Sequence, residues 1–155
     1  MAVFLWSKKM EKKYELVHSD KIVHEGRELT RIRALKDIPF HSVKAGDLGG
    51  YIEKESNLSQ NGGAWVSDQA AVYGNAQVYG NAIIRENAQV YGAALIGESA
   101  QIKGHSEIKY LAIIGASTII DGYSVISNTI HKGDEYLHSP KSPALELQPP
   151  SLAVF

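Results

Sequence analysis

The sequence contains no cysteine, which excludes disulfide scaffolds and every zinc or iron–sulfur site that needs thiolate ligands. Aromatic residues make up only 8% of its 155 residues, and the formal net charge is −1. Such a balanced charge does not favour nucleic acid or an anionic membrane as a partner. The longest apolar run near the N-terminus, Ala2 to Trp6, is too short for a signal-peptide core or a membrane span. These absences predict a soluble protein, which we expect in the cytoplasm, although the lack of cysteine does not itself indicate a compartment.

The centre of the chain carries a repeat of six residues. From Ala64 to Thr129 the sequence divides into eleven consecutive blocks without a gap. The third position of every block is Val or Ile: 66, 72, 78, 84, 90, 96, 102, 108, 114, 120 and 126. The first position is always small, with Ala in the first seven blocks. A helix is excluded because a period of 3.6 cannot keep every sixth residue on one face.

A short strand followed by a corner accounts for this spacing. Positions 1 and 3 of a strand point to the same side, so the small and the β-branched residues face inward together. Positions 5 and 6 must then turn the chain, and they are Gly-Asn at 74–75 and 80–81. Three blocks make one coil of eighteen residues, and successive coils stack as parallel strands about 4.8 Å apart. The repeat therefore predicts a parallel β-helix.

Two segments carry a family resemblance. Ile96-Gly97-Glu98-Ser99-Ala100 and Ile114-Gly115-Ala116-Ser117-Thr118 resemble the hexapeptide-repeat signature, aliphatic–Gly–x–x–small. The stretch KAGDLGGYIEKESNLSQNGGAWV is similar to hexapeptide-repeat proteins of bacteriophages and prophages, over roughly residues 12–130. The resemblance implies a left-handed β-helix of triangular section that packs as a homotrimer. It implies no particular activity.

The expected organisation is all-β. Residues 1–49 form a leader and a β-meander cap, with strands at 13–18, 21–24 and 28–35 and turns at Ser19-Asp20 and Glu25-Gly26. Residues 50–131 form the β-helix of about four coils, and residues 132–155 form a Pro-rich tail. Ile52 and Leu58, with Gly50 and Ser56 as their small partners, join the register if Gly62-Gly63 is a two-residue insertion at a corner.

Residues eighteen apart should form columns on three outer faces. The first face carries Trp65, Ile83 and Ile119, and the third carries Leu95 and Ile113 beside Tyr79, Gly97 and Gly115. Contiguous apolar surface of this kind favours an interface, so we predict self-association or the binding of a protein partner through these residues. The alternative is that the cap or the tail folds over the apolar surface.

Two further sets of residues are candidates for binding or chemistry. Tyr73 and Tyr91 should stack, and with Arg85 they could bind a small ligand between subunits, although outward tyrosines also simply pair with each other. His105 and Glu86 form the one acid–base pair in the coils, and the acyltransferases of the hexapeptide family use a coil histidine as general base with acyl-CoA. Against an enzyme, no insertion longer than two residues lies between Ala64 and Thr129 to build an acceptor pocket.

The sequence thus predicts a non-catalytic structural or interaction protein of phage or prophage type, either a virion accessory part or an inhibitor of a host factor. A small acyltransferase and a ligand-binding module are the alternatives. No metal site is expected, since no two coil histidines have the spacing that the metal-dependent members of the hexapeptide class use. No cofactor is expected either.

Overall fold

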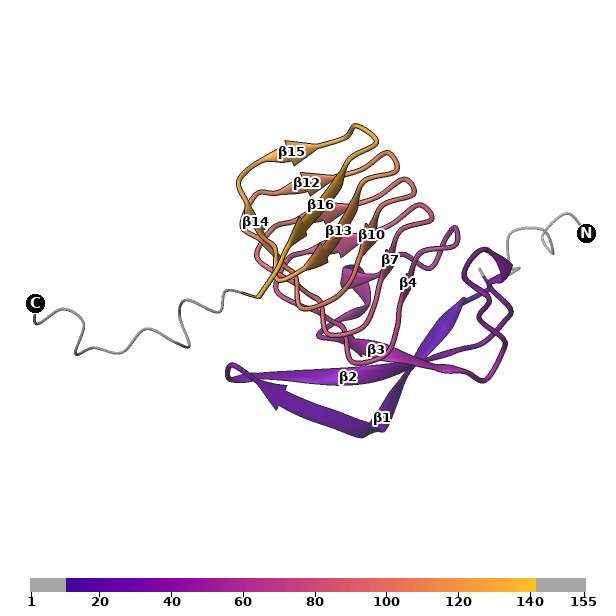
Figure 1. Ribbon diagram of the computed structural model, residues 1–155. Coiled ribbons are helices and arrows are strands. Elements are labelled where there is room, and N and C mark those ends of the chain that lie inside the picture. Colours follow the sequence, from indigo (N-terminus) through magenta and orange to yellow (C-terminus); the bar gives the residue numbers. More distant parts are fainter. Residues whose placement is uncertain (1–10, 142–155) are drawn as a thin grey trace, which may run out of the picture.

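The structure, a computed structural model, describes residues 11–141. Figure 1 shows a stack of short strands standing on an antiparallel hairpin. The described residues form sixteen strands and two short 3₁₀ helices, as follows: β1 (Tyr14–His24), β2 (Arg27–Ala34), η1 (Pro39–His41), β3 (Leu48–Ile52), η2 (Glu55–Asn57), β4 (Trp65–Val66), β5 (Ala71–Val72), β6 (Gln77–Val78), β7 (Ile83–Ile84), β8 (Gln89–Val90), β9 (Leu95–Ile96), β10 (Gln101–Ile102), β11 (Glu107–Lys109), β12 (Ile113–Ile114), β13 (Ile119–Gly122), β14 (Val125–Ser127), β15 (Ile130–His131) and β16 (Tyr136–Ser139).

The strands distribute over three sheets, and from β4 onward each strand is followed in the chain by one in the next sheet. The first sheet has the order β16-β13-β10-β7-β4, the second β1-β2-β3-β5-β8-β11-β14, and the third β15-β12-β9-β6. Within the repeat the neighbours are parallel and eighteen residues apart, as in the pairing of Val72 with Val90. The predicted β-helix is therefore confirmed as a β-solenoid of about five turns.

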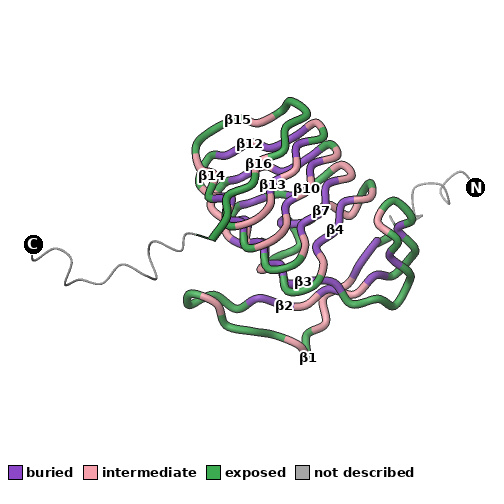
Figure 2. The backbone as a smooth tube through the Cα atoms, viewed as in Figure 1, coloured by how far each residue is buried: buried purple, intermediate pink, exposed green. Residues whose placement is uncertain are grey.

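The core is the file of Val and Ile side chains at the third position of each block. The ten members from Val66 to Ile120 are at most 1% exposed, and only Ile126, in the last turn, is partly buried. Val72, Val90 and Ile108 lie on consecutive rungs of the second sheet, in one interior column. The small first-position residues are equally buried, so the two inward positions together fill the interior of the solenoid. Figure 2 shows buried stretches of the backbone recurring from turn to turn.

The corners use one backbone conformation throughout. All eleven fifth-position residues have positive φ, between 51° and 74°, and six of the eleven are not glycine. The glycines here cannot carry a Cβ without loss, because one on Gly92 would lie 2.6 Å from the backbone nitrogen of Tyr110. At the three acidic corners the side chain accepts a hydrogen bond from the backbone of the next turn, as when Glu86 Oε1 accepts from the Gly104 N–H at 2.8 Å.

The two-residue insertion at Gly62-Gly63 is confirmed by the register upstream of it. Ile52 pairs with Val72, and Leu58 forms a bridge with Val78, so both pairs are twenty residues apart instead of eighteen. The predicted small partner Ser56 is wrong, because Ser56 is exposed and Asn57 is buried instead. The 3₁₀ turn of η2 rotates the chain here, which places an amide side chain inside this corner.

The solenoid continues past the point where the six-residue spacing stops. Ile113 pairs with Ile130 and Ile119 with Tyr136, a spacing of seventeen in both cases. This turn has one residue fewer than the others, so the six-residue spacing of Val and Ile no longer holds. For this reason the sequence predicts β16 as part of the tail, whereas the structure places it in the solenoid. Residues 142–155, which hold the remaining part of the predicted tail, lie outside the described residues.

The cap is a meander whose last strand is also the first rung of the second sheet. The predicted Glu25-Gly26 turn is confirmed, since β1 and β2 pair from His24 opposite Arg27 outward. The predicted turn at Ser19-Asp20 is wrong, because β1 runs through it with a register shift between Val17 and Lys21. The third meander strand is β3, antiparallel to β2 on one side and parallel to β5 on the other. The cap thus covers the first turn by continuing its sheet.

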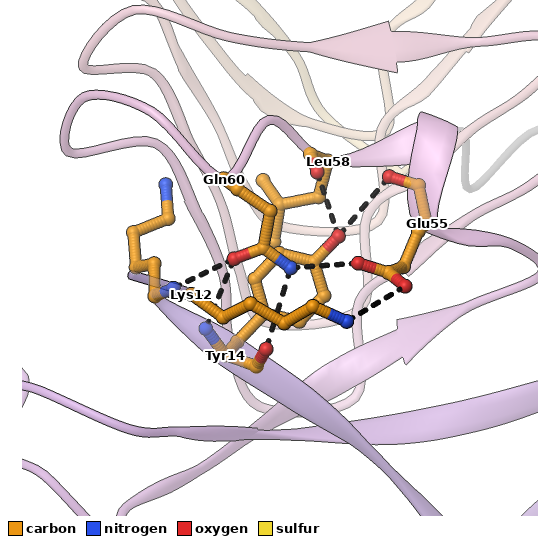
Figure 3. Close-up of polar contacts among 6 residues, drawn as sticks. Lys12, Tyr14, Glu55, Leu58 and Gln60 are labelled. Atoms are coloured by element: carbon orange, nitrogen blue, oxygen red, sulfur yellow. Dashed lines mark hydrogen bonds and ion pairs between the residues drawn. The ribbon is translucent and has the colours of Figure 1, made fainter. Parts of the chain in front are cut away.

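Buried polar contacts hold the start of β1 against the first turn. The hydroxyl of Tyr14 donates to the carbonyls of Leu58 and Glu55 at 2.7 and 3.1 Å (Figure 3). Gln60 Oε1 accepts from the backbone N–H groups of Lys13 and Tyr14. The buried Lys13 ammonium donates to the carbonyl oxygens of Ala64 at 2.6 Å and Gly62 at 3.3 Å.

We expect Lys13 to make stability depend on pH in the mildly alkaline range. Burial, and secondarily Lys36, lowers the pKa of Lys13 from 10.5 to about 8. Between these values the unfolded chain holds a proton that the folded chain has lost, so the free energy of unfolding should rise with pH. Urea unfolding at pH 8 and pH 9.5 measures the effect, below the range in which the raised pKa values of Tyr14, Tyr73 and Tyr91 oppose it.

The control for this prediction is Lys13→Met, which keeps the length of the side chain and removes the titrating group. The variant should be less stable than the wild type, because the Ala64 carbonyl loses its donor, and it should lack the rise between pH 8 and 9.5. Parallel pH curves for the two proteins would contradict the assignment to Lys13.

Candidate functional site

The third sheet presents an apolar column that no other described element covers. Leu95 and Ile113 are paired neighbours facing outward, and Ile130 extends the column at 66% exposure. Tyr79 lies beside the column and is 40% exposed. We call Tyr79, Leu95, Ile113 and Ile130 the third-sheet patch.

Gly97 and Gly115, which the sequence predicts to belong to the interface, are buried by the side chains of Tyr79 and Glu98. A Cβ on Gly97 would overlap the ring of Tyr79, and one on Gly115 would overlap the carboxylate of Glu98. The absence of a Cβ at Gly97 and Gly115 thus leaves room for the side chains of Tyr79 and Glu98 to lie over them. The open surface on this sheet is formed by the patch and not by the glycines.

The first sheet is covered at its N-terminal end by the chain itself. Trp65 is 1% exposed and packs edge-on against Tyr14 at 6.5 Å, and Ile83 is 7% exposed. Neither residue is available to a partner, so on this sheet the cap covers the apolar face. Ile119, further along the same sheet, is partly exposed.

A groove lies where the η1 segment meets the first sheet. Its volume is about 420 Å³, and it is lined by Phe40, His41, Ser42, Ile83, Arg85, Ser99, Gln101, Ser117 and Ile119. His41 is fixed by a hydrogen bond from Nε2 to the Asn81 carbonyl at 2.8 Å. Burial lowers the pKa of His41, and the positive charges of Arg85 and Lys13 lower it further. The groove therefore combines apolar side chains, hydroxyl groups and one guanidinium, with no Asp or Glu in its lining.

The tyrosine pair stacks as the spacing predicts. The rings of Tyr73 and Tyr91 lie 4.9 Å apart and are 4° from parallel. Tyr73 is buried under the β1–β2 hairpin, with His24 edge-on to its ring and Arg27 above it. Tyr91 donates its hydroxyl proton to Glu107 at 2.8 Å. The stack thus joins the hairpin to the second sheet, while Arg85 lies apart from it in the groove on the first sheet.

The structure does not couple His105 to Glu86. The His105 ring is exposed and stacks on Tyr123 at 4.7 Å, 3° from parallel. Glu86 instead binds the Gly104 N–H, and within residues 11–141 no hydrogen bond or ion pair joins it to His105. A general base needs a partner or a substrate pocket at its nitrogen, and this corner provides neither among the described residues.

Neither a scan against protein-family models nor a search of curated proteins finds a match to this chain. Across the described part of the chain, no three His, Cys, Asp or Glu side chains are grouped to hold a metal ion. Residues 11–141 also contain no helix long and apolar enough to cross a membrane. The geometry therefore leaves two surfaces with features of a functional site, the third-sheet patch and the groove at η1.

Proposed function

We propose that this protein is a non-catalytic structural and interaction module whose third sheet binds further copies of the chain. The observation that carries the proposal is the uneven covering of the three sheets. The hairpin packs on the second sheet through Leu29 and Tyr73, and Tyr14 packs on the first through Trp65. The described chain offers the third sheet no comparable cover.

The chemistry of the patch suits an apolar contact between copies of the chain. Leu95, Ile113 and Ile130 form an aliphatic column, and the flanking Glu98 and Lys132 already pair with each other at 3.9 Å. A second copy would remove this column from water without leaving a charge unpaired. The hexapeptide resemblance favours a trimer as the closed assembly.

The wider role is also part of the proposal. The likeness of residues 44–66 to phage and prophage proteins supports a phage or prophage origin and action in the host cytoplasm. A rigid, trimeric β-solenoid suits a virion accessory part, or a protein that sequesters a host factor by presenting repeated faces. Catalysis is not needed for either role.

Light scattering on the full chain tests the self-association. The wild type should have three times the 16.9 kDa chain mass. The double variant Leu95→Glu with Ile113→Glu should be monomeric, because four carboxylates or more would meet in the desolvated contact. The matched control is Val23→Glu with Val125→Glu, which adds the same charge at side chains 78% and 57% exposed on the second sheet.

The control variant should keep the mass of the wild type. A monomeric wild type at high micromolar concentration would overturn the proposal. Equal dissociation of both double variants would also overturn it, because the effect would then reflect net charge rather than the third sheet.

A further inference from the structure

Arg85, in the groove at η1, is the one arginine without a carboxylate partner among residues 11–141. Arg27, Arg31 and Arg33 pair with acidic side chains at 2.9, 3.0 and 2.7 Å. Arg85 makes a single side-chain hydrogen bond within the described chain, from Nη2 to Gln101 Oε1 at 3.4 Å. Its Nε is buried and donates no hydrogen bond to the described part of the chain.

The Arg85 guanidinium therefore keeps N–H donors that can bind a ligand. It carries five N–H donors in a planar fork that matches a carboxylate or a phosphate, and here the protein uses one of them. A partly buried charge without a counter-ion is also costly, so a bound anion would relieve the cost. Arg85 therefore points to an anionic ligand in the groove.

The lining of the groove agrees with this sign, although Asp134 lies beside it and accepts from the Ser117 N–H at 3.3 Å. No Asp or Glu lines it, and the pKa of His41 is lowered chiefly by burial, with smaller contributions from the positive charges of Arg85 and Lys13. An oxyanion beside Arg85 would thus meet the attraction of that guanidinium and no acidic side chain in the lining.

The rest of the lining suits a ligand that is both hydroxylated and ring-shaped. Ser99 and Ser117 stand on successive turns, and their hydroxyls make no hydrogen bond within the described chain. Phe40 is 60% exposed at the rim, free to pack on the apolar face of a sugar ring. Ile83 and Ile119 form an apolar floor, and a volume of about 420 Å³ lies within the usual range of small-molecule sites.

We propose that the groove at η1 binds a sugar that carries an oxyanion, a sugar acid or a sugar phosphate, with Arg85 binding the oxyanion and Phe40 packing on the ring. This inference is independent of the proposed self-association, because the groove lies on the first sheet and the patch on the third.

Titration of the full chain, followed by calorimetry or by NMR shifts, tests the site with four probes: glucuronic acid, glucose 6-phosphate, glucose and inorganic phosphate. At least one of the two charged sugars should bind about tenfold or more tightly than glucose, since a charge-assisted bidentate contact is the main attraction. Whichever of them binds more tightly identifies the oxyanion as carboxylate or phosphate.

Three variants locate the binding. Arg85→Gln should weaken the charged sugar about tenfold, and Arg27→Gln, which removes an equal charge outside the groove, should leave it unchanged. Phe40→Ala should weaken the charged sugar but not inorganic phosphate, because only the sugar packs on the ring. Unchanged urea midpoints for Phe40→Ala and Arg85→Gln establish that loss of binding is not loss of folding.

Several results would overturn the proposal. They are glucose binding as tightly as the charged sugars, unchanged affinity in Arg85→Gln, and no binding of either charged sugar at 50 mM, about the weakest affinity such a site could have. Inorganic phosphate binding as tightly as glucose 6-phosphate would overturn the sugar part and leave a simple anion site.

Discussion

Replacing Ile102 by alanine is expected to lower the free energy of unfolding by about 3 kcal/mol. Ile102 is fully buried on the middle rung of the first sheet, between Ile84 and Ile120. Both neighbours belong to the same interior column and are themselves held by their own turns. The column cannot collapse into the space left by the deleted methyl groups, so the cost of the cavity adds to the lost burial.

The control is the same substitution at Ile119, the outward-facing neighbour of Ile120 on the next rung. Ile119→Ala should cost less than about 1 kcal/mol, because its side chain is partly exposed and leaves no enclosed cavity. Urea denaturation followed by circular dichroism measures both variants. Equal losses in the two would contradict the inward and outward assignment of the strand positions.

The success of the sequence analysis in the coil has a simple physical reason. Every turn must fill the same interior space, so Val or Ile recurs at every sixth residue. These eleven residues indicate which side of each strand faces inward. A shift of the strand register by one residue would turn all of these Val and Ile side chains toward solvent. The register of Val72, Val90 and Ile108 was therefore predictable without any long-range information.

The corners show where composition alone is insufficient. Glycine and asparagine indicate positive φ, yet Glu86, Tyr110 and Ala116 adopt it as well. The stacked backbone hydrogen bonds from turn to turn impose this conformation on whichever residue occupies the position. The residue type predicts the corners that carry glycine or asparagine, and the six-residue spacing predicts the other corners.

The contacts that form the cap and the groove do not recur at a fixed spacing along the sequence. Ser19-Asp20 has the composition of a turn, but Asp20 lies in a continuous β1 and binds Arg31 of β2 at 3.0 Å. The groove brings Phe40 and His41 against residues more than forty positions further along the chain. Nothing in the six-residue pattern indicates which sheet the η1 segment covers, so Arg85 could be singled out from the sequence but its neighbours could not.

Replacing Asn57 by aspartate is expected to cost about 3 kcal/mol or more at neutral pH, although the two side chains have nearly the same shape. Asn57 is fully buried, and its Oδ1 accepts from the backbone N–H groups of Glu53 and Lys54 at 3.1 and 2.9 Å. Its Nδ2 donates to the carbonyls of Gly74 and Ala76 at 3.2 and 2.9 Å. An aspartate keeps the first two bonds but turns a carboxylate oxygen toward the two carbonyls.

The sign of the pH dependence separates this mechanism from a general loss of packing. The folded state of Asn57→Asp prefers the protonated acid, which can donate to one carbonyl, so the pKa of the new carboxyl is raised on folding. The deficit relative to the wild type should be smallest near pH 4, about the ordinary pKa of an aspartate, and should grow as the pH rises through the folded value. Urea unfolding of both proteins between pH 4 and 7 measures the difference.

The matched control is Asn75→Asp, at an exposed asparagine of the neighbouring corner whose Oδ1 accepts from the Lys54 ammonium at 3.1 Å. The free energy of unfolding of this variant should be close to that of the wild type, because water solvates the new charge and Lys54 is its partner. A deficit of Asn57→Asp that does not change with pH would mean that the two carbonyls do not face the carboxylate. Asn57 would then merely fill the corner, and the first turn would not depend on its four hydrogen bonds.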